Sequence, residues 1–427
     1  MLFLLLLAPL LTRGPVLLGA SADSVYVSWE TSDKQAGGSV HYGLSTAYGI
    51  TITDPAYTQH HHVQLTGLLP GTTYHYGIDS DAAAEDSVFH TAPVGPVGTP
   101  IKFIVYGDNR SNAVDHQKVV DSIRNEAGIA FLLHTGDMAQ NYPFSGQDQW
   151  DQFFSVEHDL LRSNPFFPTV GNHETLDSLQ SWSWFFSPPR FDPTASVSYY
   201  STDWAQLHLV SLDTFDATGP NVDPKHDTIS AAQFEWLKSD LDDALRRGQL
   251  IFVSLHHGAV SHATGPDAHG GSDLVRTQVI PELNARGVTA VFAGHDHIYE
   301  RGCSDGMDYF VAGGGGAPLY PVADGGPDPT ILALKSTLEY SVLTVTGRKV
   351  AGYTKDTQGY VIDTFDLPTQ NCQHDAGVPA QPDGGSPDAG QADAGSTGTT
   401  PRGGSCGSAG AATLLSLLPL LWRRRRK

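Results

Sequence analysis

The chain has 427 residues, of which 40% are hydrophobic, and this length allows two or three domains with separate cores. Its formal net charge of −21 argues against a basic groove for nucleic acid, because such grooves bind phosphates through an excess of lysine and arginine. The three cysteines, Cys303, Cys372 and Cys406, lack the C-x-x-C spacing of a zinc knuckle or redox site.

The chain opens with an apolar run, MLFLLLLAPLLT, which is typical of the core of a secretory signal although no basic residue precedes it. We interpret residues 1–12 as a truncated signal peptide, with a buried first strand as the alternative. Residues 13–95 consist of short alternating segments such as SVYVSWET between glycine and polar turns, which predicts an all-β sandwich. We expect its histidines to lie on an exposed loop without a chemical role: His60, His61 and His62.

From Pro100 the pattern changes to strand-length apolar runs alternating with helical segments. Five runs predict buried strands: IKFIVY, IAFLLH, FFPTV, LIFVSL and TAVFA. Helices are predicted at DHQKVVDSIRNE and at SAAQFEWLKSDLDDALRRG, the latter with a serine N-cap and a glycine stop. This alternation indicates an α/β layered domain over residues 100–368, with LHLVSLDT, DYFVAGGG and YSVLTV as further strands.

The remaining chain is low in apolar residues until its last segment. Residues 369–404 are rich in Pro, Gly, Ala and Asp and predict a disordered linker. Residues 405–427 contain Cys406, a short apolar stretch and the basic end RRRRK, and resemble the tripartite C-terminal sorting signal of myxobacterial surface proteins. The resemblance implies surface attachment, with Cys406 as a cleavage or lipidation site. A marginal transmembrane tail is the alternative, although the stretch is shorter than the ~20 residues that span a bilayer.

Each of the five predicted strands is followed within a residue or two by a potential metal ligand. The junctions YGDNR, HTGDM, VGNHE, SLHHG and AGHDH contain these candidates: Asp108, Asp137, Asn172, His256, His295 and His297. In layered α/β domains the binding crevice lies at the carboxyl ends of the strands, so these side chains are predicted to gather at one edge. Glycines that precede them are expected to permit the sharp turns this requires: Gly107, Gly136, Gly171 and Gly294.

The spacing of His295 and His297 supports the same site. In extended backbone, side chains two positions apart leave the same face, so these imidazoles can converge on one point. An isolated H-x-H pair is as readily explained by solvated loop histidines. The five ordered junctions together favour the metal site.

The ordered motifs G-D, G-D, G-N-H-E, H-H and G-H-x-H resemble those of the calcineurin-like metallophosphoesterases, and GHDHIYER with the N-terminal sandwich is closest to their purple acid phosphatase branch. The resemblance covers about residues 13–366. It implies an α/β (α+β) four-layer sandwich of two mixed β-sheets flanked by helices, preceded by a small all-β fibronectin type III-like domain. It also implies two divalent or trivalent transition metal ions, for which oxygen and imidazole ligands suit Fe, Zn or Mn.

The family pattern assigns a role to each candidate residue. One metal would be held by Asn172, His256 and His295. The other would be held by Asp108 and His297, with Asp137 bridging both. A hydroxide between the metals would attack phosphorus, and His173 would protonate the leaving oxygen.

Two positions depart from the family pattern. Many members have a histidine two residues after the first aspartate, where this chain has Arg110. Purple acid phosphatases have a tyrosine three residues after the second aspartate, where this chain has Gln140, and Tyr142 lies two residues beyond it. The first metal is left with few ligands and is expected to bind weakly. Arg110 either donates to phosphate oxygens through its planar fork or makes a structural ion pair.

Four further residues are weaker candidates. The glycine-rich loop after His256 contains His262 and His269, which either contact substrate or belong to mobile surface. Cys303 and Cys372 have no place in the metal assignment, and export would permit a disulfide between them, with free thiols as the alternative.

These features predict an exported or surface-anchored metallophosphoesterase that hydrolyses small phosphomonoesters in the manner of an acid phosphatase. Phosphodiesterase or nucleotidase activity is the alternative within the same chemistry. A surface binding protein with a degenerate metallophosphoesterase fold is the alternative from another class, because the usual histidine is missing at Arg110.

Overall fold

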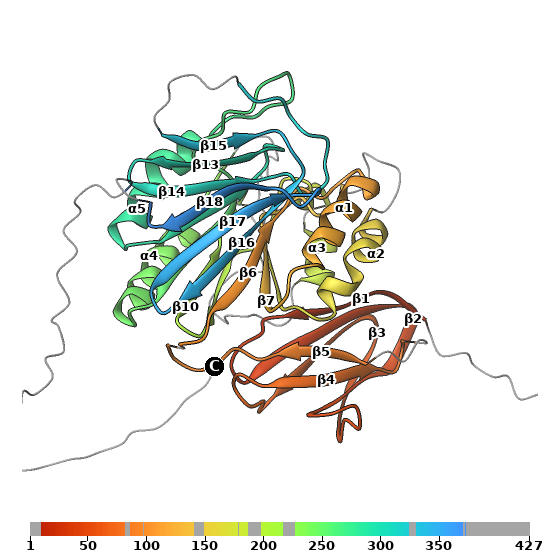
Figure 1. Cartoon of the computed structure of the whole chain (residues 1–427). Coiled ribbons are helices and arrows are strands. Elements are labelled where there is room, and N and C mark those ends of the chain that lie inside the picture. The colour runs from red at the N-terminus through yellow and green to blue at the C-terminus, as the bar shows by residue number, and fades with distance from the viewer. Residues whose placement is uncertain are drawn as a thin grey trace, which may run out of the picture. The chain divides into compact units, whose positions relative to one another are not determined.

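A computed structural model describes residues 10–81, 86–96, 98–140, 149–177, 179–186, 198–216, 227–323, 330–369 and 372. Within them the chain forms an all-β N-terminal part followed by two mixed sheets with helices, as the sequence predicted (Figure 1). Most of the predicted signal segment, linker and sorting segment lies outside these residues. None of the described helices is long and apolar enough to cross a membrane.

The N-terminal β-domain contains five strands: β1 (Leu11–Leu18), β2 (Ser24–Gly43), β3 (Ile50–Thr66), β4 (Thr73–Ile78) and β5 (Ser87–His90). The long strand β2 pairs with β1 through its first half and with β4 through its second, while β3 runs along its other edge. β1 begins at Leu11, inside the apolar segment that we interpreted as a signal. The domain buries large side chains, including Trp29, Tyr76 and Phe89.

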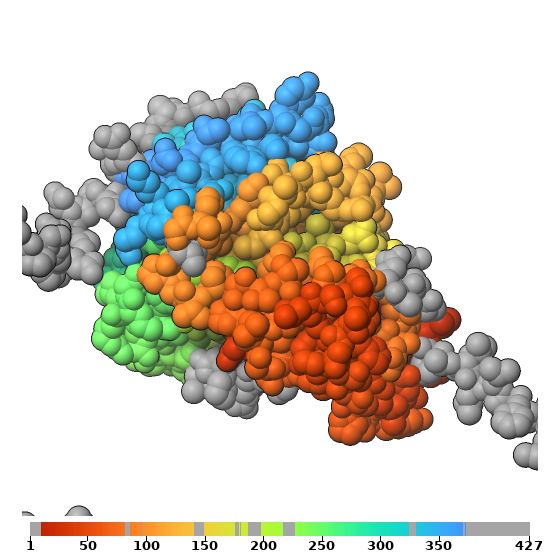
Figure 2. Space-filling model, turned by 60° about the horizontal axis from the view of Figure 1, so that its bottom comes forward, coloured from red at the N-terminus to blue at the C-terminus, as the bar shows by residue number. Residues whose placement is uncertain are grey.

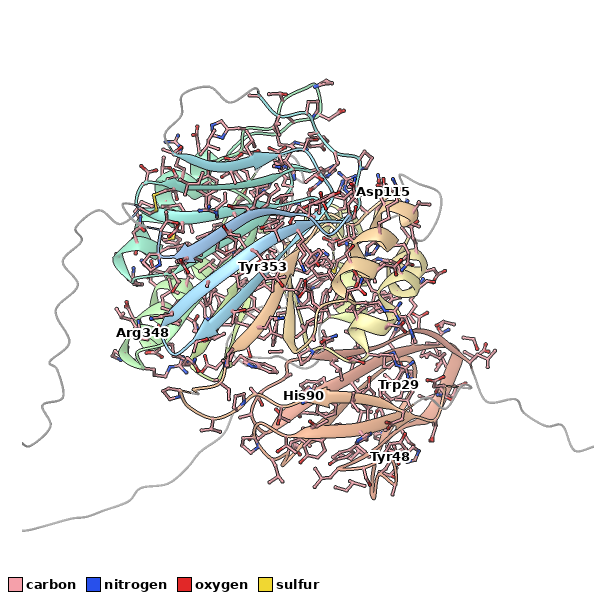
Figure 3. All side chains as sticks on the ribbon, viewed as in Figure 1. Trp29, Tyr48, His90, Asp115, Arg348 and Tyr353 are labelled. Atoms are coloured by element: carbon pink, nitrogen blue, oxygen red, sulfur yellow. A yellow bond between two sulfur atoms is a disulfide. The ribbon has the colours of Figure 1, made fainter. Side chains whose placement is uncertain are left out.

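The expectation that the three consecutive histidines lie on an exposed loop is wrong, because they lie on β3. His61 is fully buried and stacks on Trp29 of β2, with ring centroids 4.9 Å apart (Trp29 is labelled in Figure 3). His60 stacks on Trp184 at 5.0 Å. Both tryptophans are distant from these histidines in the sequence. The run of three polar residues therefore gave no sign that its side chains pack against aromatic rings.

The first mixed sheet has 11 strands and includes the N-terminal β-domain. Its parallel centre consists of β6 (Ile101–Tyr106), β7 (Ile129–His134) and β8 (Phe166–Pro168). An antiparallel edge follows with β16 (Glu339–Thr346), β17 (Lys349–Asp356) and β18 (Val361–Leu367). Beside it lie α1 (Ala113–Ile123), α2 (Trp150–Leu161) and α3 (Gln180–Phe185) (Figure 1).

The second mixed sheet has seven strands. In spatial order these are β15 (Ile331–Lys335), β13 (Tyr299–Ser304), β14 (Met307–Ala312), β12 (Ala290–Gly294), β11 (Leu250–His257), β10 (Leu207–Ser211) and β9 (Tyr200–Trp204). Its helices are α4 (Ala231–Arg246), η2 (Val275–Val279) and α5 (Ile280–Ala285). Ser230 caps α4 by accepting a hydrogen bond from the Gln233 N–H, as predicted for a serine N-cap.

An aromatic core joins the two sheets. Phe103 of β6 stacks on Phe131 of β7 with centroids 4.8 Å apart, and meets Phe252 of β11 edge-on at 5.5 Å. Phe252 in turn stacks on Phe292 of β12 at 6.1 Å. Because both sheets bury their inner faces in this one core, the carboxyl ends of their parallel strands are held in fixed relation.

The N-terminal β-domain also contacts the segment around α2 (Figure 2). Leu18 at the end of β1 pairs in parallel with Phe166 of β8. The Tyr76 hydroxyl donates to the carbonyl of Arg162 at 2.8 Å. A disulfide between Cys303 and Cys372 links β13 to the segment after β18, with an S–S distance of 2.06 Å.

Candidate metal centre

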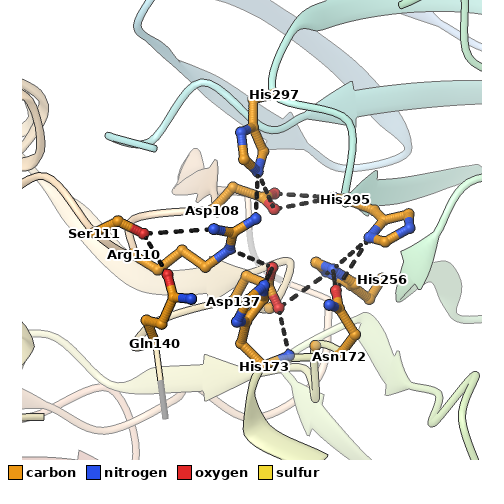
Figure 4. Close-up of polar contacts among 12 residues, drawn as sticks. Asp108, Arg110, Ser111, Asp137, Gln140, Asn172, His173, His256, His295 and His297 are labelled. Atoms are coloured by element: carbon orange, nitrogen blue, oxygen red, sulfur yellow. Dashed lines mark hydrogen bonds and ion pairs between the residues drawn. The ribbon is translucent and has the colours of Figure 1, made fainter. Parts of the chain in front are cut away.

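The six predicted ligand residues meet at the carboxyl ends of five strands (Figure 4). Asp108 follows β6, Asp137 follows β7 and Asn172 follows β8. His256 lies at the end of β11, and the pair His295 and His297 follows β12. The convergence arises because each strand is a buried apolar run that ends where its polar residue begins.

Three of these residues adopt left-handed backbone, which costs about 1–3 kcal/mol at a non-glycine position. The φ angles are 59° at Asp108, 57° at Asp137 and 74° at His295. Of the preceding glycines, Gly136 makes the sharp turn we expected, with a φ of 103°, and two others serve a different purpose. A Cβ on Gly171 would lie 2.3 Å from Oδ1 of Asp137, and one on Gly294 would lie 2.3 Å from Oδ2 of Asp108. These glycines therefore make room for the carboxylates.

One group of ligand atoms, which we call the histidine site, consists of Asp137, Asn172, His256 and His295. Asn172 Oδ1 lies 3.1 Å from both His256 Nε2 and His295 Nδ1, and these two nitrogens are 3.2 Å apart. Asp137 Oδ1 lies 3.4 Å from His256 Nε2. A tetrahedral ion with bonds of about 2.0–2.1 Å sets its ligand atoms about 3.3 Å apart, so this group fits one transition metal ion.

The protonation of His256 strengthens this fit. Its Nδ1 donates to the carbonyl oxygen of Thr135 at 2.8 Å, which leaves a lone pair on Nε2. That lone pair faces the oxygens of Asn172 and Asp137, which are also acceptors. Burial lowers the pKa of His256 and takes that of His295 well below 6.5, so both imidazoles are neutral, as metal ligands must be.

A second group, which we call the arginine site, consists of Asp108, Arg110, Asp137 and His297. Arg110 Nε donates to Asp137 Oδ2 at 2.9 Å, and Arg110 Nη2 lies 3.3 Å from His297 Nε2. His297 Nε2 is 3.7 Å from Asp108 Oδ1. The guanidinium thus binds two of the three side chains that were expected to hold the other metal. This group therefore does not fit an ion in addition to the one at the histidine site.

The two aspartates are both fully buried and influence each other strongly. Burial and the nearby charge of Asp137 raise the pKa of Asp108 well above its usual value. Burial opposes ionisation of Asp137 too, but His256, His173 and Arg110 lower its pKa well below its usual value. Oxygen and nitrogen atoms of Asp108, Asp137 and His256 lie within 4.8 Å of one another, an arrangement that a cation would stabilise.

His173, the predicted proton donor, lies beside the bridging aspartate. Its backbone N–H donates to Asp137 Oδ1 at 3.0 Å, and its Nε2 lies 3.8 Å from Asp137 Oδ2. Burial lowers the pKa of His173 to about 4. A bound phosphate anion would favour the charged imidazolium and raise this pKa.

A cavity of about 480 Å³ opens onto both sites and is lined by Arg110, Asn172, His173, Pro266, Asp267, Ala268, His269, His297, Pro318 and Tyr320. His269 stacks on His295 with ring centroids 3.9 Å apart, and Tyr320 stacks on His297 at 4.3 Å. His262 does not line this cavity, because its Nδ1 pairs with Glu300 Oε1 at 2.8 Å. The sequence offered no signal for Tyr320.

Glu174, at the start of the helical turn η1 (Glu174–Asp177), received no role from the sequence. Its Oε2 accepts hydrogen bonds from the N–H groups of Asp137 at 2.9 Å and Gly171 at 2.8 Å. The acidic residue of the G-N-H-E motif was the available signal. Gln140 accepts from the Ser111 hydroxyl at 2.8 Å, and Tyr142 lies outside the described residues.

Comparison with known families gives two matches. Residues 101–299 match the family described as calcineurin-like phosphoesterase, and residues 14–92 match the purple acid phosphatase N-terminal domain. Purple acid phosphatase 18 of Arabidopsis thaliana is 28% identical over 293 residues, which cover 64% of this chain and 62% of that protein. Purple acid phosphatase 21 of the same plant is 28% identical over 303 residues, covering 66% and 64%. The chain therefore spans less than two thirds of each of these relatives.

Solved structures show a likeness of fold. The purple acid phosphatase PPD1 from yellow lupin (Lupinus luteus) seeds superposes with a TM-score of 0.63 at 18% identity, covering 84% of this chain and 74% of that one. The structure of PhoD superposes with a TM-score of 0.57 at 13% identity, covering 82% and 91%.

Proposed function

We propose that this chain, which carries a calcineurin-like phosphoesterase domain behind a purple acid phosphatase N-terminal domain, is a metal-dependent hydrolase of phosphoric esters. The observation that supports this best is the set of potential ligand atoms at the histidine site. Asn172 Oδ1, His256 Nε2 and His295 Nδ1 lie 3.1 to 3.2 Å apart. These separations match those of the ligand atoms around one tetrahedral transition metal ion.

The proposed chemistry divides between the ion and the chain. A bound Fe, Zn or Mn ion would supply Lewis acidity toward a phosphoryl oxygen and an activated water. Arg110 lines the cavity and keeps N–H groups beyond its bond to Asp137, so it can hold a phosphoryl oxygen. His173 lines the same cavity and would give a proton to the leaving oxygen.

We propose a small phosphomonoester as the substrate. The cavity of about 480 Å³ is of the size that takes a small molecule, and its walls include the Arg110 guanidinium, which favours an anion. The net charge of −21 disfavours a nucleic-acid polymer as partner.

We also propose that the protein is exported and held at the cell surface by residues 405–427. The apolar first residues and the Cys303–Cys372 disulfide support export, because structural disulfides persist in oxidising compartments. Fractionation of cells that express the full chain, followed by protease treatment of intact cells, tests this. Protein found only in the cytosolic fraction would refute it.

The hydrolase proposal is tested by removing metal with a chelator, adding back Fe, Zn or Mn singly, and assaying p-nitrophenyl phosphate and bis(p-nitrophenyl) phosphate. We expect metal-dependent turnover of the monoester, loss of it in His256→Ala, and its retention in His262→Ala, whose side chain pairs with Glu300. Turnover of the diester alone would identify a phosphodiesterase. Bound metal without turnover of either ester would indicate a binding protein.

A further inference from the structure

We infer that the chain binds a single transition metal ion, at the histidine site, and that the guanidinium of Arg110 replaces the second ion. This inference rests on the cation site of the proposed function but not on which ester is hydrolysed. It departs from the pair of metals that the family resemblance implies.

The first argument is the position of the guanidinium (Figure 4). Arg110 Nε donates to Asp137 Oδ2 at 2.9 Å, and Nη2 lies 3.3 Å from His297 Nε2. His297 Nδ1 donates to the carbonyl of Pro318 at 2.7 Å, so Nε2 bears a lone pair directed at the guanidinium. Arg110 therefore satisfies the same two acceptors that a first metal would need.

The second argument is that these contacts are buried and permanently charged. The side chains of Arg110, Asp137 and His297 are 14%, 0% and 2% exposed. A guanidinium does not lose its proton in proteins, so a metal ion at the arginine site would be pressed against a fixed positive charge. If a metal ion displaced Arg110, the buried carboxylate of Asp137 would lose its ion pair with the guanidinium.

The third argument is the contrast with the histidine site. Among the described residues no arginine or lysine is bonded to Asn172 Oδ1, His256 Nε2 or His295 Nδ1, whereas Arg110 contacts both Asp137 and His297 at the arginine site. A metal ion can therefore enter the histidine site without displacing a charged side chain, and it cannot do so at the arginine site. One divalent ion and the guanidinium together outweigh the charges of Asp108 and Asp137, so the centre still attracts a phosphate anion.

The experiment counts metal on purified full-length protein by mass spectrometry after reconstitution with Mn²⁺, and records its electron paramagnetic resonance spectrum. We expect one equivalent per chain and the six-line signal of an isolated Mn²⁺ ion. Arg110→His restores the family's usual ligand and should bind a second equivalent with an exchange-coupled spectrum. His297→Ala is the matched control and should still bind one equivalent, whereas His256→Ala should bind none.

Two equivalents with a coupled spectrum in the unaltered protein would overturn the inference while leaving the proposed hydrolase intact. A single equivalent in a folded Arg110→His protein, judged by circular dichroism, would also count against it. If that variant does not fold, loss of the single equivalent in His297→Ala would overturn the inference, because it would place the ion at the arginine site. No bound metal in the unaltered protein would defeat both the inference and the proposed function.

Discussion

Glu174 holds the backbone of Asp137 in place, because its Oε2 accepts a hydrogen bond from the Asp137 backbone N–H at 2.9 Å. Its Oε1 accepts from the Met138 N–H, also at 2.9 Å. Both oxygens therefore act as acceptors, and together they hold the turn in which Asp137 has a φ of 57°. The left-handed backbone that aims the Asp137 carboxylate at the metal centre depends on this buried acid.

The first prediction concerns Glu174→Gln. The amide presents an NH₂ group to backbone N–H donors, so one of these bonds is replaced by a repulsive contact. We expect metal affinity to fall about 10- to 100-fold, as for other groups that orient metal ligands. Titration of the metal-free protein with Zn²⁺ measures this.

The matched control is Glu339→Gln. Burial raises the pKa of both Glu174 and Glu339 to about 8, so the two acids differ in their hydrogen bonds and not in their pKa. Glu339 Oε2 has no hydrogen-bond partner among the described residues, so the amide can place its NH₂ group there without opposing an N–H donor, and this variant should keep its metal affinity. Equal losses in the two variants would argue that Glu174 has only a general structural role.

The second prediction concerns His173→Asn, and it tests the proposed proton donor. An alkyl phosphate needs a proton on its leaving oxygen, whereas p-nitrophenolate leaves readily as an anion. We expect kcat to fall by about 10²- to 10⁴-fold for an alkyl monoester and far less for p-nitrophenyl phosphate. Losses of equal size on both esters would show that His173 positions substrate or Asp137 instead of transferring a proton.

The third prediction separates the two loop histidines. His269 lines the cavity, and its backbone N–H is held by Asp296 Oδ1 at 2.8 Å, so His269→Ala should raise KM by roughly 10-fold, which corresponds to about 1.4 kcal/mol. His262 is paired with Glu300 away from the cavity, so His262→Ala should leave KM unchanged. Steady-state kinetics on a monoester decide this, and a larger KM effect at His262 would reverse the assignment.

The sequence predicted a strand correctly where it contains an apolar run about as long as a typical strand. β6 and β7 cover the same residues as IKFIVY and IAFLLH, because each run lies between turn signals and most of its residues are buried. β13 was not predicted, because Glu300 and Arg301 interrupt its apolar pattern. Arg301 Nε donates to Asp363 Oδ2 at 2.6 Å, a partner distant in sequence that only the folded chain provides.

The sequence predicted that the six junction residues lie close together, but it did not predict the contacts among them. The junction residues converge because the carboxyl ends of the strands lie at one edge of the domain. The sequence indicates this, because a polar residue follows directly after each apolar run. Arg110 was recognised as a departure, but its approach to His297 depends on the Pro318 carbonyl that orients the imidazole. The stacking of Tyr320 on His297 likewise arises from a loop without any periodic pattern.

The fourth prediction concerns His208, which joins strand β10 to helix α4 far from the metal centre. Its Nδ1 lies 2.7 Å from Asp203 Oδ1 and its Nε2 lies 2.8 Å from Asp240 Oδ2. Burial disfavours the imidazolium, but the two carboxylates outweigh burial and raise the pKa of His208 above 6.5. The charged pairings therefore contribute their full stability below about pH 6.5 and lose it as pH rises through the folded-state pKa.

His208→Gln should consequently destabilise the protein most under acidic conditions. We expect its Tm to lie several degrees below that of the unaltered protein at about pH 5.5, with a smaller gap at about pH 9. His90→Gln, at the exposed end of β5 (Figure 3), is the control, and as a surface substitution it should change Tm little. A Tm gap for His208→Gln that stays constant or widens with rising pH would mean that His208 acts as a neutral hydrogen-bonding residue, and that its two carboxylate partners do not hold it charged.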